Sequence, residues 1–596
     1  MREKIIISLA GVTGLEPEKI QLEIPENEDF GDYSSNAALS TFENAKLQNP
    51  NAKWKNARDL AEEIVSKLEK DSRLKDHIDR IEVAGAGFIN FWLTKSDLVR
   101  NLKDVVEQRE KYGDTNLLKS KRINFEFGQP NTHKLPHIGH LFSYIYGSAM
   151  SNILEAAGGQ IRRVNYQGDI GLHVAKCLWA LRQASTKGGQ AGLAYQKVKE
   201  GGALTDRVIL LQKMYQEGST AYDSNETTKN EINGLNKKIY EGDSEIVDLW
   251  KQTREWSIEY YKKFEERLGI KFDRYYFESE VHSHGKETVE ANVDKIFKKS
   301  EGALIFEGSK YGLHDRVFVT NYGTPTYEAK DLYLEVLKYK EWPYDLLIIT
   351  TAHEQNDYFN VIYRALEEVN PELRGKLHHI GFGMVNLKTG KMSSRTGEII
   401  GAVELVNLTI DAVKKLIKEE SGLSVEEKND IAEKVGIGAI KYSFLKNNPL
   451  QDTKFDLEES IAKEGNSGPY IQYTYARTQS VRKKSKRVEE FKSINNLTKQ
   501  QFNDEETAVM RKLVQFQDVI AMSAKMYSPN VLCNYLYDVA KKFNNFYDKH
   551  RILDIKSENV EERESISKFR IALTEAAGTV LKNGLNLLGI ESSERM

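Results

Sequence analysis

The sequence predicts an α/β protein built on a doubly wound parallel sheet, with a small α+β unit before it and helices after it. A strand candidate at 121–127 ("KRINFEF") is followed by a loop, a stretch of helical periodicity at 137–159 and a second strand candidate at 160–169. Strand, helix and strand in this order form a βαβ unit with parallel strands. Ligands of such sheets bind beyond the carboxyl ends of the strands, so we expect the site at the loop 128–136.

The rest of the chain differs from this centre in its periodicity. Because 596 residues exceed one hydrophobic core, we expect three or more domains. Near the N-terminus, Leu60, Ile64 and Leu68 follow helical spacing, and 78–93 is typical of a strand, a glycine turn and a strand. Further strand candidates lie at 302–308, 316–320, 344–351 and 377–385. We expect an α+β domain at 1–110, the α/β domain at 111–400 with a helical insertion at about 185–265, a helical stem at 401–454 and a helical domain at 455–596.

Composition and charge restrict where the protein acts and what it binds. Cys177 and Cys533 allow neither a disulfide framework nor a zinc knuckle, which predicts a reducing compartment, the cytoplasm. There is no long apolar run and no signal peptide, so we expect no membrane segment. The net charge of -3 leaves any polyanion to local patches. The basic stretch 477–487 is either a nucleic-acid contact or a solvated helix end.

Three histidines, His133, His137 and His140, lie close together where the loop meets the predicted helix. A metal site is not expected, because no cysteine is near, HExxH is absent and only His137 and His140 share a helix face. Nothing indicates a catalytic nucleophile, since GxSxG is absent and neither cysteine has an evident histidine partner. A helix N-terminus with two imidazoles one turn apart instead favours phosphate, and Gly139 leaves room for a nucleotide to approach.

A second candidate for phosphate contact is "GKMSSRTG" at 390–397, which follows a strand candidate. It is small, glycine-rich and cationic, so it can fold over a triphosphate, or it is a plain surface turn. It does not fit the P-loop pattern.

"HIGH" at 137–140 and "KMSSR" at 391–395 together resemble the two signature motifs of class I aminoacyl-tRNA synthetases. Longer stretches resemble arginyl-tRNA synthetases in particular. These are "FEFGQPNTHKLPHIGH", "NYQGDIG", "TYEAKD", "GPYIQYTYAR" and "LLGIESSERM", with "EDFGDYSSNAAL" and "VAGAGFINFWL" near the N-terminus. The resemblance implies a Rossmann-type catalytic domain, an N-terminal domain that contacts the tRNA elbow and a C-terminal anticodon-binding domain.

The resemblance implies ATP-dependent attachment of L-arginine to tRNA(Arg) through an arginyl-adenylate, with release of AMP and pyrophosphate. The implied catalytic residues are Lys134, His137, His140 and Lys391. The implied ATP-binding residues are Asn131, His137, Gly139, His140, Lys391, Met392 and Ser393. Mg²⁺ on the ATP phosphates is expected from the chemistry, without a protein metal site.

One position departs from the class pattern, because Ser394 stands where the second motif usually has a lysine. Removing a charge-stabilising group typically costs ~10²–10³ in rate, so another cation should compensate. We hypothesise that Lys134 does so; the alternative is a solvated loop lysine.

The remaining implied residues bind arginine and tRNA. A guanidinium binds most strongly to carboxylates that approach it edge-on. The implied arginine-binding residues are Glu126, Asn131, Tyr327, Asp331 and Gln355. For Asp331, an ordinary acid at a helix start is the alternative. The tRNA-binding residues are Phe88, Asn90, Tyr473, Arg477, Tyr547 and Met596, although aromatic residues on helices also serve as core. The family suggests a monomer.

Two other functions compete with this interpretation. One is another class I synthetase, but a cysteinyl enzyme wants a zinc site and a glutamyl site should present cations where Glu126 and Asp331 present anions. The other is a synthetase-like tRNA-binding protein that has lost catalysis, against which His137, His140 and Lys391 argue.

Overall fold

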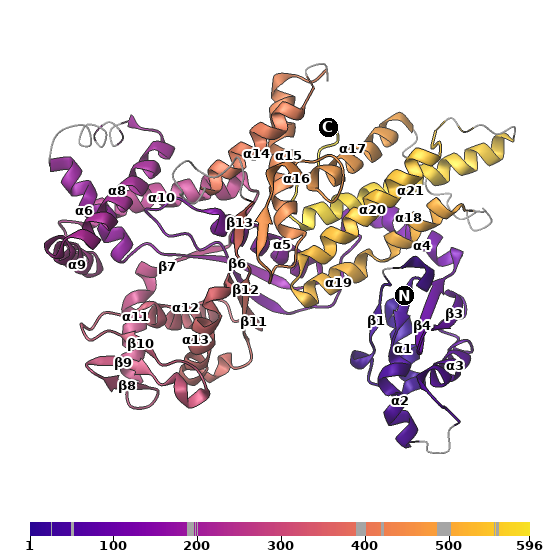
Figure 1. The fold of residues 1–596 in the computed structure, drawn as a ribbon, viewed down its shortest axis with the longest axis horizontal. Coiled ribbons are helices and arrows are strands. Elements are labelled where there is room, and N and C mark those ends of the chain that lie inside the picture. The colour runs from indigo at the N-terminus through magenta and orange to yellow at the C-terminus, as the bar shows by residue number, and fades with distance from the viewer. Residues whose placement is uncertain are drawn as a thin grey trace.

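The computed structural model describes the whole chain except residues 26, 49–52, 187–195, 197, 199–200, 389–400, 419–421, 486–501, 554 and 556–558. Figure 1 shows a central sheet, two groups of elements on one side of it, and a helical region that connects it to the N-terminal unit. Among the described residues, no helix is long and apolar enough to cross a membrane.

The N-terminal unit is a four-stranded antiparallel sheet covered by helices. Its strand order is β1-β2-β4-β3. Its elements are α1(Arg2–Thr13), β1(Leu22–Glu23), β2(Tyr33–Ser35), α2(Ala37–Gln48), α3(Ala57–Leu68), β3(Ile78–Ala84), β4(Phe88–Leu93) and α4(Lys95–Gln108). Leu60, Ile64 and Leu68 form the buried stripe of α3, as their spacing predicts.

The central sheet has five parallel strands in the order β12-β11-β5-β6-β7. Its elements are β5(Arg122–Glu126), α5(Ile138–Ala156), β6(Gln160–Gln167), β7(Arg274–Phe277), β11(Leu346–Ala352), α13(Asn356–Val369) and β12(Leu377–Phe382). From β5 the chain runs outward to β6 and β7 and then returns to the other side of β5. The strand order therefore reverses between β5 and β11, and the carboxyl ends of these two strands mark the switch point where ligands bind. The predicted α/β fold is confirmed.

Two groups of elements interrupt the sheet. The helices α6(Leu172–Thr186), α8(Leu204–Ser224), α9(Glu226–Glu241) and α10(Val247–Arg267) connect β6 to β7. The second group, between β7 and β11, comprises α11(Glu278–Ala291), β8(Phe297–Ser300), β9(Ala303–Phe306), β10(Arg316–Val319) and α12(Tyr327–Glu341). Two of the later strand candidates thus form a separate antiparallel sheet, β10-β9-β8, because short turns between consecutive strands favour antiparallel pairing.

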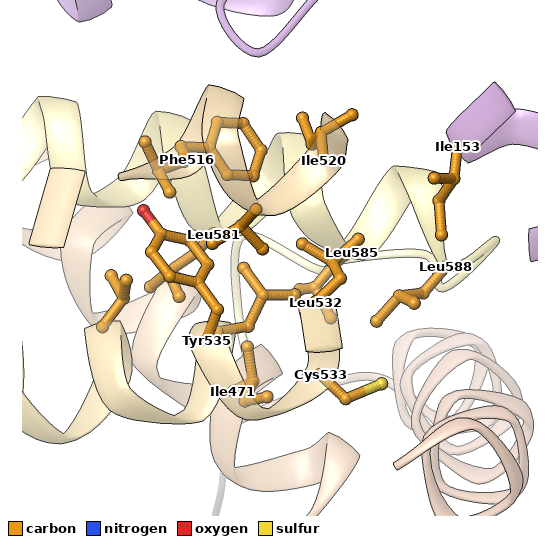
Figure 2. Close-up of a cluster of buried hydrophobic side chains, with 14 of the residues drawn as sticks. Ile153, Ile471, Phe516, Ile520, Leu532, Cys533, Tyr535, Leu581, Leu585 and Leu588 are labelled. Atoms are coloured by element: carbon orange, nitrogen blue, oxygen red, sulfur yellow. The ribbon is translucent and has the colours of Figure 1, made fainter. Parts of the chain in front are cut away.

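Helices make up nearly all of the C-terminal part. They are α14(Ala402–Leu416), α15(Val425–Leu445), α16(Leu457–Ser460), α17(Gly468–Ser485), α18(Asp504–Val514), α19(Phe516–Met526), α20(Pro529–Lys549) and α21(Val560–Leu587), interrupted by β14(Thr453–Phe455), which pairs with β13(Val385–Leu387). Figure 2 shows the core that α19, α20 and α21 share, with Ile153 of α5 beside Leu588 and Leu585. The helix that follows the histidine loop is thus buried in the C-terminal helices. Cys177 and Cys533 are both buried and free.

Candidate functional site

A cavity of about 960 Å³ opens at the carboxyl ends of the central strands. Glu126 ends β5, and Ala352 and Phe382 end β11 and β12; all three line the cavity. Nine residues predicted from the sequence line it together. They are Glu126, Asn131, Lys134, His137, Gly139, His140, Tyr327, Asp331 and Gln355.

His137 and His140 form the entrance to helix α5. His137 is the N-cap, and its Nδ1 accepts a hydrogen bond from the Gly139 N–H at 3.1 Å. The Nδ1 of His140 accepts from the His137 N–H at 3.2 Å, which completes a capping box. An imidazole that accepts at Nδ1 carries its proton on Nε2. The two rings, 3.9 Å apart between centroids, therefore each have an Nε2–H to donate to a ligand.

Both imidazoles are neutral at pH 7. Desolvation and then the nearby Lys134 charge lower the pKa of His137. Burial, followed by the charges of His137 and Lys134, lowers the pKa of His140 to about 3. Neutral rings at the positive end of a helix dipole can donate to phosphate or ribose oxygens.

His133 does not join the other two histidines in the cavity. It is fully buried, with Nε2 hydrogen-bonded to the Thr253 hydroxyl at 2.8 Å and Nδ1 to the Thr132 hydroxyl at 2.9 Å. Its role is to hold the loop on α10. Nowhere in the part of the chain that the structure describes do three or more His, Cys, Asp or Glu side chains form a group that could hold a metal.

Asn131 lies where the loop meets the end of β6. A Cβ at position 168 would lie only 2.1 Å from the Asn131 Oδ1, so this close approach of the Asn131 side chain requires Gly168. The Asn131 carbonyl accepts from the Tyr261 hydroxyl at 2.6 Å, and this anchors the backbone to α10. Gln355 also lines the cavity; it is exposed and lies in a short 3-10 helix after β11.

The other end of the cavity is acidic, and two buried lysines beside it form three ion pairs. Lys338 pairs with Glu126 and also with Glu335, at 2.7 Å from the latter. Lys330 pairs with Glu278 at 2.7 Å. Glu126, predicted to bind arginine, is thus already neutralised in part by Lys338, because α12 brings that lysine to the end of β5.

Asp331 is the carboxylate of this end that has no ion pair among the described residues. It is half-buried and accepts a hydrogen bond from the Tyr358 hydroxyl at 2.6 Å. Desolvation by the cavity walls raises the pKa of Asp331 to about 8; the Tyr358 hydrogen bond opposes this, and the charges of Glu126, Glu335 and Glu278 add to it. A bound cation would therefore stabilise the ionised form.

Three residues predicted to bind tRNA meet outside this cavity. The Arg477 guanidinium of α17 lies between two partly exposed rings, 5.3 Å from the Tyr473 centroid and 4.6 Å from that of Tyr547 on α20. It donates to the Asn544 side chain at 2.7 Å. Two aromatic faces with a cation between them can stack on and pair with an unpaired nucleotide. Met596 is 37% exposed.

In the N-terminal sheet, the two predicted residues differ in exposure. Phe88 is 42% exposed, whereas Asn90 is 2% exposed and accepts a hydrogen bond from the Ser34 hydroxyl. Phe88 therefore presents surface to a partner, and Asn90 ties β4 to β2. The predicted residues Lys391, Met392 and Ser393 lie outside the described residues, as does Ser394.

Several cavity residues were missed by sequence reasoning. Glu278 directly follows β7, a four-residue strand that no alternation marks, so the rule of strand carboxyl ends could have found it only once β7 was recognised. Tyr166 lies at the end of β6, within the motif "NYQGDIG". Tyr358 carries no signal in the sequence, because its role depends on how α13 packs against α12.

The site and fold define a class I tRNA synthetase: residues 101–457 match the model of the catalytic domain of class I (R) tRNA synthetases. Residues 1–93 match the arginyl tRNA synthetase N-terminal domain, and 471–596 the DALR anticodon-binding domain. The arginine–tRNA ligase of Treponema denticola is 31% identical over 97% of this chain and 95% of its own length. That of Bacteroides thetaiotaomicron is 31% identical over 86% of each chain. The chain belongs to the arginyl-tRNA synthetase family.

A solved structure shares the fold. The arginyl-tRNA synthetase of Thermus thermophilus superposes with a TM-score of 0.79 over the whole of both chains, at 21% identity. This structure confirms the predicted fold, and the family models and relatives confirm the family that the short sequence motifs resemble.

Proposed function

We propose that this chain attaches L-arginine to tRNA(Arg) in two steps, first forming an arginyl-adenylate from ATP and then transferring the arginyl group to the tRNA 3′ end. The observation that carries the proposal is the polarity of one cavity. Its first end has two Nε2–H donors and Lys134 at a helix N-terminus, and its second end holds Asp331 among further carboxylates. The first end suits phosphates, and the second suits a cationic side chain.

In the first step, the arginine carboxylate attacks the α-phosphorus of ATP and pyrophosphate leaves. The carboxylate is already ionised at pH 7, so the chain needs to supply positioning and charge stabilisation, not a general base. His137 and His140 donate from Nε2 to phosphate and ribose oxygens. A Cβ at position 139 would meet the His137 ring at 2.9 Å, so Gly139 lets the ring keep its position over the first turn of α5.

The leaving pyrophosphate needs cations. Lys391, with Met392 and Ser393, belongs to the motif that would cover it, and Lys134 replaces the lysine missing at position 394. ATP enters as its Mg²⁺ complex, which fits an ion that keeps its waters and binds mainly through phosphates.

At the acidic end, the arginine guanidinium pairs with Asp331. Glu126, Glu278, Asp331 and Glu335 carry four negative charges when ionised, and Lys330 and Lys338 return two positive ones. The surplus favours a cationic ligand, and Tyr327 forms part of the wall. Asn131 and Gln355 bind the α-amino and carboxylate ends. Citrulline should be rejected, because it would leave Asp331 unpaired in a desolvated place.

The flanking domains hold the tRNA. We assign 1–110, through Phe88 and the strand that Asn90 stabilises, to the tRNA elbow, and 455–596 to the anticodon. Tyr473, Arg477, Tyr547 and the chain end at Met596 form the anticodon side. The residues 111–400 are the catalytic domain with its insertion at 185–265, and 401–454 are the stem. The proposal includes a monomer that acts in the cytoplasm.

The test is ATP–pyrophosphate exchange with each of the twenty amino acids, with and without total tRNA. We expect exchange with arginine and with none of the other nineteen amino acids. Exchange with another amino acid would move the specificity and discredit the role of Asp331. Retained tRNA binding with no exchange under any condition would leave a tRNA-binding protein that has lost catalysis.

A further inference from the structure

The loop that carries Lys134 is held by the helical insertion as well as by the end of β6. From α10, the Tyr261 hydroxyl shares its one hydrogen between the Lys134 carbonyl at 2.5 Å and the Asn131 carbonyl at 2.6 Å, and the Ser257 hydroxyl accepts from the His133 N–H at 3.0 Å. A second helix of the insertion, α8, reaches the same loop by separate contacts.

Three contacts connect α8 to residues 134 and 135. The Lys134 Nζ lies 4.3 Å from the centroid of the Tyr215 ring. The Leu135 N–H donates to the Gln212 side chain at 2.9 Å. The Leu135 side chain also packs against the hydrophobic core of the insertion. Gln212 and Tyr215 are three residues apart on one helix, so they present the same face to the loop.

The placement of Lys134 gives these contacts a consequence for catalysis. Lys134 lines the same cavity as His137 and His140, and its charge lowers the pKa of both imidazoles. Among the residues that the structure describes, no carboxylate is within ion-pair distance of Lys134. The contact that orients its long, flexible stem is therefore the Tyr215 ring.

We propose that Tyr215 and Gln212 of α8 are positioning residues for Lys134. Gln212 fixes the backbone at Leu135, and the Tyr215 ring holds the ammonium on the phosphate side of the cavity. The insertion thereby contributes to the activation step without touching ATP or arginine. This inference rests on the proposed function, and specifically on the role of Lys134.

The experiment compares arginine-dependent ATP–pyrophosphate exchange of Tyr215→Leu with that of Tyr222→Leu. Tyr222 is a matched control, since it lies on the same helix and also carries a lysine, the Lys176 Nζ at 4.4 Å, but does not contact the loop. We expect Tyr215→Leu to lower kcat about 2- to 30-fold, the range of a cation–π contact. The KM for arginine should not change, and Tyr215→Phe, which keeps the ring, should restore kcat.

A double-mutant cycle with Lys134→Ala separates positioning from general structure. In that background Tyr215→Leu should have no further effect. The inference is overturned if Tyr215→Leu matches the Tyr222→Leu control, or if its loss persists without Lys134. If Tyr215→Leu does not fold, Tyr215→Met, which keeps an apolar side chain of similar length, takes its place in the same cycle.

The same set distinguishes this inference from the proposed function. If the unmodified chain gives no exchange with arginine, the proposed function fails. If Lys134→Ala exchanges at a near-normal rate, the role of Lys134 fails and nothing remains to be positioned. If Lys134→Ala is slow and Tyr215→Leu is not, only the proposal that α8 positions Lys134 is wrong.

Discussion

Asp331 shows how the surroundings of one side chain decide its chemistry. Three neighbouring carboxylates surround it, yet two lysines of the same cluster pair with Glu126, Glu278 and Glu335 and leave Asp331 with a tyrosine hydroxyl. Its pKa of about 8 means that it is largely protonated at pH 7 when the cavity holds no cation. A guanidinium would favour the ionised form and lower that pKa.

Arginine binding should therefore release a proton. Near pH 7, titration calorimetry in buffers of different ionisation enthalpy should show up to one proton released per arginine, and apparent affinity should rise with pH, up to about tenfold per unit below pH 8. Above pH 8 the dependence should level off. In Asp331→Asn, which cannot ionise, the release should disappear and affinity should fall. Binding with equal affinity and no proton release from pH 6.5 to 8.5 would contradict this role.

The hydrogen-bond partners of the ring nitrogens likewise explain why the three histidines differ in role. His133 has both ring nitrogens occupied by hydroxyls, whereas His137 and His140 use only Nδ1 and keep Nε2 for a ligand. The sequence predicted that His137 and His140 share a face at a helix start, because the 3.6-residue period is local. It could not predict that His133, with positive φ, turns away toward α10.

At the scale of elements, the first turn of helix α5 both stabilises the helix and presents hydrogen-bond donors to the cavity. His137 both caps the helix and presents a donor, so the two roles can be separated by substitution. Asparagine is a good N-cap, while alanine is not.

His137→Asn should keep α5 stable but lose the Nε2–H donor. We expect a fall of ~10²–10³ in exchange rate, comparable to the loss of a charge-stabilising donor. His137→Ala should lose a similar factor in rate and, in addition, about 0.5–2 kcal/mol of stability. Thermal unfolding of the two variants checks the difference, and the asparagine variant should be the more stable one. Near-normal exchange by His137→Asn would show that the imidazole does not act on the substrate.

The elements also mark what sequence patterns can and cannot give. The βαβ unit 122–167 was predictable, because both strands contain β-branched and aromatic residues and the helical periodicity between them stops at Gly158 and Gly159. The ion pairs of α12 were not: Lys330 and Lys338 look like a solvated helix face, and only the packing of α12 beneath β5 and α11 makes them buried. Asp331 was found by resemblance, since by pattern alone it is an ordinary acid near a helix start.

At the scale of the whole molecule, the N-terminal domain docks on the C-terminal helices. Figure 1 shows the indigo N-terminal domain beside the orange and yellow C-terminal helices. The Tyr33 hydroxyl of β2 donates to Asp518 of α19 at 2.7 Å. Just after that domain, the Tyr112 hydroxyl donates to the Leu513 carbonyl of α18 at 3.0 Å. These partners are about 400 or more residues apart, so no local periodicity predicts them, and the sequence supported only the existence of the separate domains.

The Tyr33–Asp518 contact offers a test of this docking. The contact is partly buried, and desolvation raises the pKa of Asp518 while the Tyr33 hydrogen bond lowers it. Tyr33→Phe removes one donor to a partly buried carboxyl group, which typically costs about 1.5–3 kcal/mol. Amide exchange in β2 and α19 should therefore become faster, because the interface opens more often. The control is Tyr322→Phe, since Tyr322 is 88% exposed.

Arginine-dependent exchange of Tyr33→Phe should remain close to normal, because the cavity is formed by the central sheet and its insertions, not by the N-terminal domain. Aminoacylation of tRNA should fall instead, since a tRNA held at elbow and anticodon needs the two domains in fixed relation. If amide exchange at the interface and aminoacylation both match the Tyr322→Phe control, this hydrogen bond does not hold the domains together. If pyrophosphate exchange falls as steeply as aminoacylation, the docked N-terminal domain acts on the catalytic cavity itself. The proposal that this domain contributes only to tRNA binding would then be wrong.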